Sequence, residues 1–350
     1  MNVDQAIQRA RAWVEQQSTH IPGFHGAFLA GSLTRMPPNT PLEPWRDVDV
    51  VVVTTDPGSV QGDRLELSLD GIIFECGVLS DEPFRSPEGI LSSAEHADNL
   101  AAGVILADPT GSLQKLHAQV VAEYARRRWV QARCDSRKEY IGRRMRQARE
   151  ALAADNFPAV FMHFYVAMSL LVGLTAQADA KPLTLRRGFV LSGELLESWG
   201  RADLHEEALA LLGSAHLSRE EVEQFLAHFD EAFELAVRVK RKPIHYDFKF
   251  QRHLRPYYVD GTREMLQEGR HREAIYWIIG YCYQAWLVLL NDAPEALQQP
   301  HLERLVSFFE KLDVLPTSDW ASRLDRLQDV VARFSAAIDE RIRTQPGLFD

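Results

Sequence analysis

The feature that most constrains the fold is AFLAGSLTRMPPNTPLEPWRDVDVVVV, residues 27–53. Two short apolar runs, 27–30 and 47–53, flank a proline-rich loop, and each run predicts a β-strand. Because side chains alternate along a strand, Asp47 and Asp49 point to the same face. Two carboxylates this close repel each other, and burying both without a cation is costly. The pair therefore predicts a divalent metal site at the start of the second strand.

Gly31 and Ser32 directly follow the first of these strands. Glycine permits a close approach of the backbone, and exposed N–H groups beside a serine hydroxyl can hold phosphate. Mg²⁺ prefers a few carboxylate ligands, keeps water ligands and accepts phosphate oxygens. A phosphate-binding turn beside a metal-binding carboxylate pair is typical of phosphoryl or nucleotidyl transfer.

The stretch RLELSLDGIIFECGVLS, residues 64–80, predicts a β-hairpin with Asp70 and Gly71 as its two-residue turn. Counting outwards from the turn places Glu66 opposite Glu75 on a polar face, while apolar residues share the other face. Like charges directly opposite each other destabilise a sheet. The two glutamates therefore indicate a nearby cation or a polar cleft, and they extend the acidic pair to a predicted face of four carboxylates.

Length and hydrophobic spacing predict an α+β protein, with a small mixed β-sheet domain at the N-terminus followed by α-helical bundles. Residues 1–118 are expected to form the sheet domain, and 119–240 a helical bundle that completes the active-site cleft. A basic, proline-containing join at 240–256 gives the next boundary, so 241–350 are expected to form a further C-terminal bundle.

Composition narrows the class of protein. The net charge is −10, whereas a protein that coats nucleic acid is usually basic overall. Residues 119–180 nevertheless hold ten Lys and Arg against six Asp and Glu, so a local basic patch stays open. The three cysteines are far apart and form no CxxC pair, which favours a reducing cytoplasm over a disulfide framework or a zinc site. No run of 18 apolar residues occurs, so no membrane-spanning helix is expected.

The strand–Gly–Ser–loop–Asp-x-Asp pattern resembles the nucleotidyltransferases of the DNA polymerase β superfamily. A closer likeness, over residues 20–200, is to the aminoglycoside nucleotidyltransferases, the kanamycin-modifying enzymes among them. The loop between Ser32 and Asp47 departs from that family, because its 14 residues make it slightly long. Met36 and Pro37 also follow Arg35, where the family often has a glycine.

The resemblance implies transfer of a nucleoside monophosphate from ATP or another nucleoside triphosphate, with two Mg²⁺ ions and release of pyrophosphate. It implies that Gly31, Ser32 and Arg35 contact the nucleotide. Metal binding by Asp47 and Asp49 would be joined by Glu75 and Glu66, which match the opposed glutamates of the family's hairpin.

A second match lies in the helical region, where Glu139-Tyr140-Ile141-Gly142-Arg143 resembles an E-Y-x-G-K stretch of the family, with Arg for Lys. The resemblance implies that Arg143 contacts nucleotide phosphate. It also makes Glu139 an alternative to Glu75 as the general base. Residues four apart on a helix can equally form a surface ion pair, and that interpretation stays open.

Three function classes remain. The first is a cytoplasmic enzyme that modifies a hydroxyl of a small molecule, aminoglycoside-like and hence linked to antibiotic resistance. The second modifies protein or RNA, and the third is a non-catalytic, antitoxin-like module that binds nucleotide. The resemblance also implies that a homodimer can complete the site.

Overall fold

The computed structural model describes residues 1–59, 64–69, 71–241 and 247–350, without the side chains of residues 59, 64–67 and 247. The chain divides into two compact units. The first unit comprises Met1–Ser136, Gln177–Thr184 and Ile342–Asp350, and the second comprises Arg137–Ala176 and Leu185–Arg341. Each unit is described by itself below.

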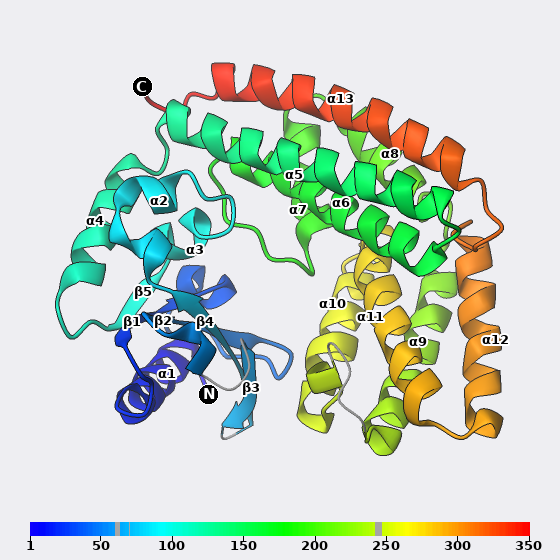
Figure 1. Cartoon of the computed structure of the whole chain (residues 1–350), viewed down its shortest axis with the longest axis horizontal. Helices are drawn as coiled ribbons and strands as arrows, with labels where there is room; N and C mark the ends of the chain where they lie inside the picture. Colours follow the sequence, from blue (N-terminus) through cyan, green and yellow to red (C-terminus); the bar gives the residue numbers. More distant parts are fainter. Residues whose placement is uncertain (60–63, 70, 242–246) are drawn as a thin grey trace. The chain divides into compact units, whose positions relative to one another are not determined.

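The first unit is built on a five-stranded mixed sheet in the order β3-β4-β2-β1-β5 (Figure 1). β2 and β4 are parallel, and the other neighbouring strands are antiparallel. The strands are β1 Phe24–Ala30, β2 Asp47–Thr54, β3 Arg64–Leu69, β4 Ile72–Ser80 and β5 Val104–Ala107. A small mixed sheet near the N-terminus, followed by helices, confirms the expected α+β class.

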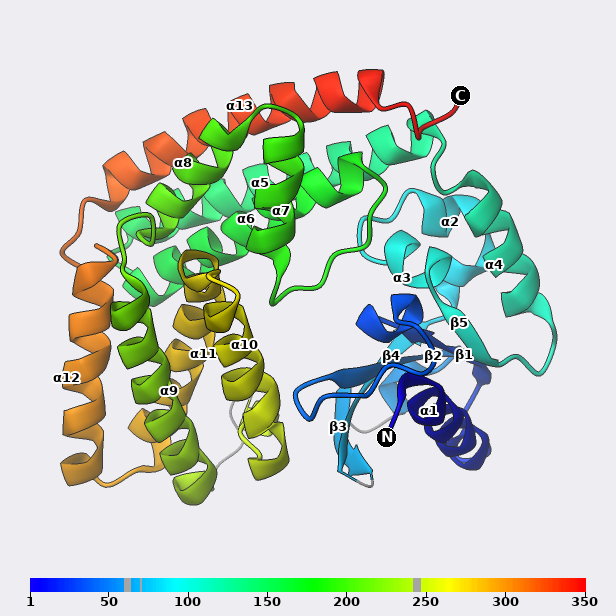
Figure 2. The ribbon, with the colours of Figure 1, turned by 180° about the vertical axis from the view of Figure 1, so that it is seen from behind.

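Helices cover both faces of this sheet (Figures 1 and 2). α1, Val3–Ser18, packs its small apolar residues against Val48, Val50 and Val52 of β2. Val53 of β2 instead faces the core formed with α2–α4. These three helices are α2 Pro87–Leu91, α3 Ala97–Ala101 and α4 Ser112–Glu123. The alternation of β2 thus buries apolar side chains on both faces over most of its length.

The predicted hairpin is confirmed in its register. Glu66 pairs with Glu75, and Leu69 pairs with Ile72 at the turn. Phe74 and Cys76 are buried on the α1 face, as the alternating pattern requires. Asp70, the first turn residue, lies outside the described residues.

The second unit is helical. Its helices, three of which continue into the first unit, are α5 Arg127–Ala153, α6 Phe157–Ala178, α7 Gly188–Ser198, α8 Ala202–Leu212, α9 Arg219–Val239, α10 Gly261–Gln267, α11 His271–Asp292, α12 Glu295–Lys311 and α13 Trp320–Thr344. Short 3-10 or π turns occupy Ser32–Arg35, Pro57–Ser59, Glu82–Arg85, Asp247–Lys249, Arg252–Leu254 and Pro256–Asp260.

α11 is the central helix of this unit, packed against α7, α8, α9, α10 and α12. Most of its aromatic stretch is buried, Trp277 and Tyr276 included, because apolar residues occur all around the helix. α9 packs directly against α11, so the helices on either side of residue 240 belong to one unit. The three expected segments, 1–118, 119–240 and 241–350, therefore differ from this division, and they stay a prediction.

By length and composition alone, α6 and α11 could each cross a membrane. Half of the apolar window of α6 and 72% of that of α11 are buried inside the protein. Core helices of globular proteins meet the same criterion, so these two helices are weak evidence for a membrane.

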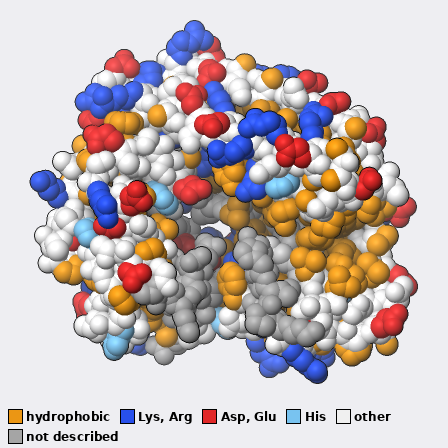
Figure 3. Space-filling view, viewed as in Figure 1, with side chains coloured by type: hydrophobic (Ala, Val, Ile, Leu, Met, Phe, Trp, Pro, Cys, Tyr) orange, Lys and Arg blue, Asp and Glu red, His pale blue; other side chains and the backbone are white. Residues whose placement is uncertain are grey.

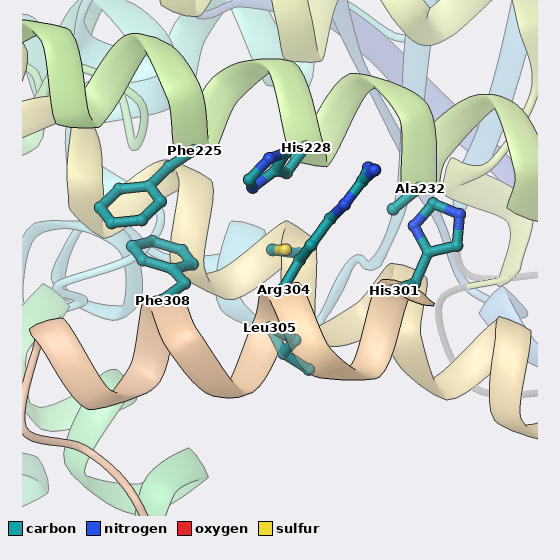
Figure 4. A pocket seen from close by; sticks show the side chains of 8 residues that line it. Phe225, His228, Ala232, His301, Arg304, Leu305 and Phe308 are labelled. Atoms are coloured by element: carbon teal, nitrogen blue, oxygen red, sulfur yellow. The ribbon is translucent and has the colours of Figure 1, made fainter. Parts of the chain in front are cut away.

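A small cavity of about 20 Å³ lies among α9, α11 and α12 (Figure 4). This volume holds about one water molecule, and it is too small for a nucleotide or a sugar. Its lining residues are Phe225, His228, Ala232, Cys282, His301, Arg304, Leu305 and Phe308.

Candidate metal centre

Three carboxylates meet on one face of the sheet where β2 begins. The parallel register sets Asp49 beside Glu75, and Asp47 lies two residues earlier on the same face. One carboxylate oxygen from each of the three lies within 4.8 Å of the others, and all three residues are half-buried. Further along this face of β2 come Val51 and Val53, packed under α2–α4. The face therefore changes from apolar to acidic where the helical cover ends.

Gly31 explains how the chain turns so close to these carboxylates. Ala30 pairs with Asp49, and the next residue, Gly31, leaves β1 with a φ of 71°. A Cβ atom on Gly31 would lie 1.7 Å from Oδ2 of Asp49. Only glycine satisfies both the left-handed backbone and this contact. The Gly-Ser turn that the sequence singled out is thus in close contact with Asp49 of the acidic pair.

The turn after Gly31 is held by its own side chains. Thr34 donates from Oγ1 to the carbonyl oxygen of Gly31 at 2.9 Å, and Arg35 donates from Nη1 to the same oxygen at 3.4 Å. Ser32, the first residue of the turn, is half-buried. These bonds keep the cation of Arg35 in the turn that borders the carboxylates, where the sequence predicted a phosphate contact.

The carboxylate set fits a divalent cation of the Mg²⁺ class. Mg²⁺–oxygen bonds are about 2.1 Å long, so oxygens on opposite sides of an octahedral ion lie about 4.2 Å apart. The oxygens of Asp47, Asp49 and Glu75 lie within 4.8 Å of one another, so at most a small closure is needed to reach that geometry. Three oxygen donors would leave coordination positions for water or phosphate, as Mg²⁺ sites usually have.

Glu66 and Cys76 are the neighbours of Glu75 in the sheet that were considered as further metal ligands or that lie next to it in the chain. The backbone of Glu66 lies opposite Glu75 as expected, but the Glu66 side chain is outside the described part of the chain. Cys76 follows Glu75 and points to the other face of the sheet, where burial, with Glu75 adding to it, raises the pKa of its thiol to about 12. The thiol therefore stays protonated and is no ligand for this metal.

Glu139 and Arg143 lie on α5, in the second unit. Both side chains are exposed and form an i, i+4 ion pair, with Oε1 of Glu139 3.7 Å from Nη1 of Arg143. The predicted surface pair is thus present. Their predicted catalytic and phosphate-binding roles stay predictions.

The sequence did not indicate a buried network beside the site. Tyr124 donates its hydroxyl hydrogen to Oδ1 of Asp98 at 3.0 Å, and the fully buried Arg133 lies 4.5 Å above the Tyr124 ring. Burial raises the pKa of Tyr124, and Asp98 raises it further. Burial lowers the pKa of Arg35, while Asp98 and Tyr124 act on it in the opposite direction. Asp98 therefore links this network electrostatically to the turn of Arg35. Asp98 lies on the short helix α3, and the sequence around it did not indicate this link.

No protein-family model and no curated protein matches the sequence. Among solved structures, the chain is similar to a nucleotidyltransferase-like protein from Exiguobacterium sibiricum 255-15, with 15% sequence identity and a TM-score of 0.31. That alignment covers 87% of this chain and 91% of the other. Values this low do not define a family, so the functional argument depends on the carboxylate site itself.

Proposed function

We propose that the protein is a metal-dependent nucleotidyltransferase. The single observation that carries this proposal is the convergence of Asp47, Asp49 and Glu75 beside the glycine turn at Gly31. Three carboxylates this close on a sheet face repel one another, and a divalent cation bound by their oxygens offsets that repulsion. The backbone turn at Gly31, which is in close contact with Asp49, offers N–H groups and Arg35 to a phosphate.

The proposed reaction is attack by an acceptor hydroxyl on the α-phosphorus of a nucleoside triphosphate. The acceptor O–P bond forms, the bond from the α-phosphorus to the bridging oxygen breaks, and pyrophosphate leaves. Mg²⁺, two ions in the enzymes that the motifs resemble, supplies charge neutralisation at the phosphates when bound. Asp47 and Asp49 would hold it, with Glu75 as the third ligand. Gly31, Ser32 and Arg35 would orient the phosphates.

The acceptor proton needs a base. Glu75 belongs to the carboxylate group, so we assign it to metal binding. For the base we propose Glu139, which is exposed on α5 and which the resemblance offers as the alternative to Glu75. Arg143, its partner, would be the accompanying phosphate contact.

The acceptor is proposed to be a small molecule with a hydroxyl group. An acidic face favours a cationic acceptor of the aminoglycoside kind, and an activity of that kind would confer antibiotic resistance. Action in the cytoplasm and as a homodimer belongs to the same proposal. Modification of protein or RNA, and nucleotide binding without catalysis, are the outcomes that would replace it.

Titration with Mn²⁺, a paramagnetic substitute for Mg²⁺, tests the site directly. Wild-type protein should bind Mn²⁺ in an electron paramagnetic resonance titration, and Asp49→Asn should weaken binding at least tenfold. Asp56→Asn is the matched control, because Asp56 is an exposed carboxylate just beyond the opposite end of β2. Equal loss in both variants, or no Mn²⁺ binding by wild type, would remove the basis of the proposal.

The reaction is tested with a panel of four nucleoside triphosphates and candidate acceptors, with mass detection of the added nucleotide and of pyrophosphate. Wild type should modify at least one acceptor, and Asp47→Asn should abolish this with an unchanged melting temperature. Binding of metal and nucleotide without any transfer would favour the non-catalytic module instead. Transfer only to RNA or to a protein would favour the second class.

A further inference from the structure

The apolar residues of α12 are unevenly distributed along the helix. α12 packs against α9 and α11, and its buried residues are Leu305, Phe308 and Phe309. Leu297 and Val306 are 45% and 43% exposed. Figure 3 shows hydrophobic side chains on the surface over the region where Figure 1 labels α11 and α12. The buried apolar contacts of α12 therefore all come after residue 304.

The first half of α12, residues 295–304, is held less firmly. Pro300 lies inside it, and proline lacks the N–H that would bond to the carbonyl oxygen of Ala296. None of these ten residues is buried. Arg304, at the end of this half, forms an ion pair with Glu231 of α9. An interior proline and the lack of a buried side chain make this half easier to open than the half that follows.

Two histidines lie beside Arg304 where this half of α12 meets α9. His228 of α9 lines the small cavity together with His301 and Arg304 of α12. Figure 4 shows the Arg304 side chain extending between the two imidazole rings. The cavity measures about 20 Å³, so these three groups surround a space for about one water molecule. Neither imidazole has a hydrogen-bond partner in the part of the chain that the structure describes.

The charged groups that act on the two rings are mostly positive. Arg304 acts on both rings, and Arg238 of α9 acts on His301 as well. Glu231 is the carboxylate that acts on both, and it is already paired with Arg304. α11 contributes Cys282 to the cavity wall, and burial raises the pKa of this thiol to about 12, so it stays neutral. A protonated histidine would therefore meet more positive than negative charge here.

Both histidines favour the neutral form in the folded protein. Burial lowers the pKa of His228, Arg304 lowers it further, and Glu231 opposes both. The same three causes act in the same order on the pKa of His301, and His228 and Arg238 lower it as well. A histidine released to solvent has its ordinary pKa of about 6.5, so the open state binds more protons than the closed one. The closed contact is fully stable above that pH and loses stability as the pH falls below it.

The histidine pair, the central arginine and the weakly held half of α12 belong to one contact between α9 and α12. We propose that protonation of His228 and His301 on either side of Arg304 releases residues 295–304 from α9, while the second half of α12 stays in place. Release separates three neighbouring cations, and the half that moves is the one without a buried side chain. This acid-sensitive contact lies wholly in the second unit and uses none of the residues proposed for nucleotidyl transfer, so it is independent of that function.

Hydrogen–deuterium exchange of the full-length protein at pH 7.5 and pH 5.5, read by mass spectrometry, tests the proposal. After correction for the intrinsic pH dependence of amide exchange, residues 295–304 should exchange at least threefold faster at pH 5.5. Peptides from α11 and from residues 305–311 should keep their corrected rates. Unchanged exchange in residues 295–304, or an equal increase in all peptides, would overturn the proposal.

The double variant His228→Gln/His301→Gln should lose this pH dependence, because glutamine is polar but takes up no proton. Its α11 peptides should exchange as in wild type at pH 7.5, which shows that the bundle is folded. His216→Gln is the matched control, since His216 is exposed in the connection between α8 and α9, and this variant should behave as wild type. A pH dependence that persisted in the double variant would mean that the proton binds elsewhere.

Arg304→Gln separates the effect of charge from that of packing. Removal of the central cation should raise the pKa of both histidines, measured by NMR titration of the ring protons and assigned with the single variants His228→Gln and His301→Gln. The ratio of exchange rates between the two pH values should then fall below twofold. A purely structural role of Arg304 would leave the pKa of both rings unchanged, and that result would contradict the proposal.

Discussion

The start of β2 and the middle of α5 both gather charges of one sign, but they do so by different means. Asp47, Asp49 and Glu75 come from two strands, and the register of a parallel pair brings them within 4.8 Å. Arg143 and Arg144 are neighbours on one helix and share the ring of Tyr140. The first cluster depends on tertiary structure, whereas the second is largely local.

Because the two clusters are built differently, different substitutions should disrupt them. The acidic cluster should fail when the backbone around it moves, because no single helix or strand contains it. The arginine pair should fail only when its own helix or the contact with His163 on α6 is changed. Variants that shift the backbone should therefore affect mainly the acidic cluster, and variants that remove a single charge should separate the two.

The largest effect is expected for Gly31→Ala. A Cβ there would meet the Asp49 carboxylate, and the φ of 71° adds about 1–2 kcal/mol of strain. We expect a loss of Mn²⁺ affinity above tenfold, together with a lower free energy of unfolding in urea.

Gly111→Ala is the control for this variant. Gly111 has a φ of 73°, and a methyl group added to it would meet no other atom within 4 Å among the described residues. This variant should have the same backbone strain without a clash with a carboxylate, and it should keep its affinity for Mn²⁺. Similar affinity in both variants would mean that the contact with Asp49 is unimportant.

A smaller effect, about 1 kcal/mol, is expected for Ser218→Ala at the start of α9. Ser218 and Glu221 form a capping box, a local arrangement in which the Glu221 carboxylate accepts hydrogen bonds from Ser218 and Lys311. Lys311, followed by hydrogen bonds from Ser218, lowers the pKa of Glu221 to about 2. This stabilisation is present above the unfolded-state pKa of about 4.3 and is lost as the pH falls toward 2.

Urea unfolding at pH 7 and pH 3 measures this prediction. The difference between wild type and Ser218→Ala should shrink at pH 3, because Glu221 is then largely protonated in the unfolded state and its stabilisation of the folded state falls as the pH approaches 2. Glu220→Gln, in the same turn but outside the capping box, should show a smaller difference at pH 7. A gap that grows on acidification would contradict the assigned sign.

Much of the acidic site could be predicted from the sequence, because strand alternation and a two-residue turn are local rules. They placed Asp47 and Asp49 on one face and Glu66 opposite Glu75, and the structure has both features. The parallel pairing of β2 with β4 could not be derived from those rules. It depends on which strands become neighbours after the chain has crossed from one to the other.

In the second unit, less of the structure could be predicted from the sequence. The aromatic helix α11 could be predicted as core, since it is apolar on all sides. The partners of Lys138 and Arg149 on α13 are more than 170 residues away, so no periodicity reveals them. Without those partners, all basic residues of α5 look alike in the sequence, and Arg144 cannot be distinguished.

The variants Lys138→Gln and Arg146→Gln test whether basic residues of α5 that pair with α13 contribute more to stability than those that do not. Lys138 is 19% exposed and paired with Asp339, so its loss should lower the free energy of unfolding by about 0.5–1 kcal/mol. Arg146 is exposed and has no carboxylate partner within ion-pair distance among the described residues, so its loss should be neutral or slightly stabilising. Urea unfolding at low salt, where surface charges are least screened, checks both values. Equal destabilisation would show that pairing with α13 does not distinguish the two groups.

The smallest effect on stability is expected for Glu139→Gln. Its ion pair with Arg143 is 3.7 Å long, and the two side chains are 75% and 53% exposed. Such a pair contributes less than about 0.5 kcal/mol, so the melting temperature should hardly change. If Glu139 is the general base, nucleotidyl transfer should fall at least a hundredfold while Mn²⁺ binding is kept. Unchanged transfer would exclude Glu139 and leave Glu75 as the base, which would then have to act from within the carboxylate cluster.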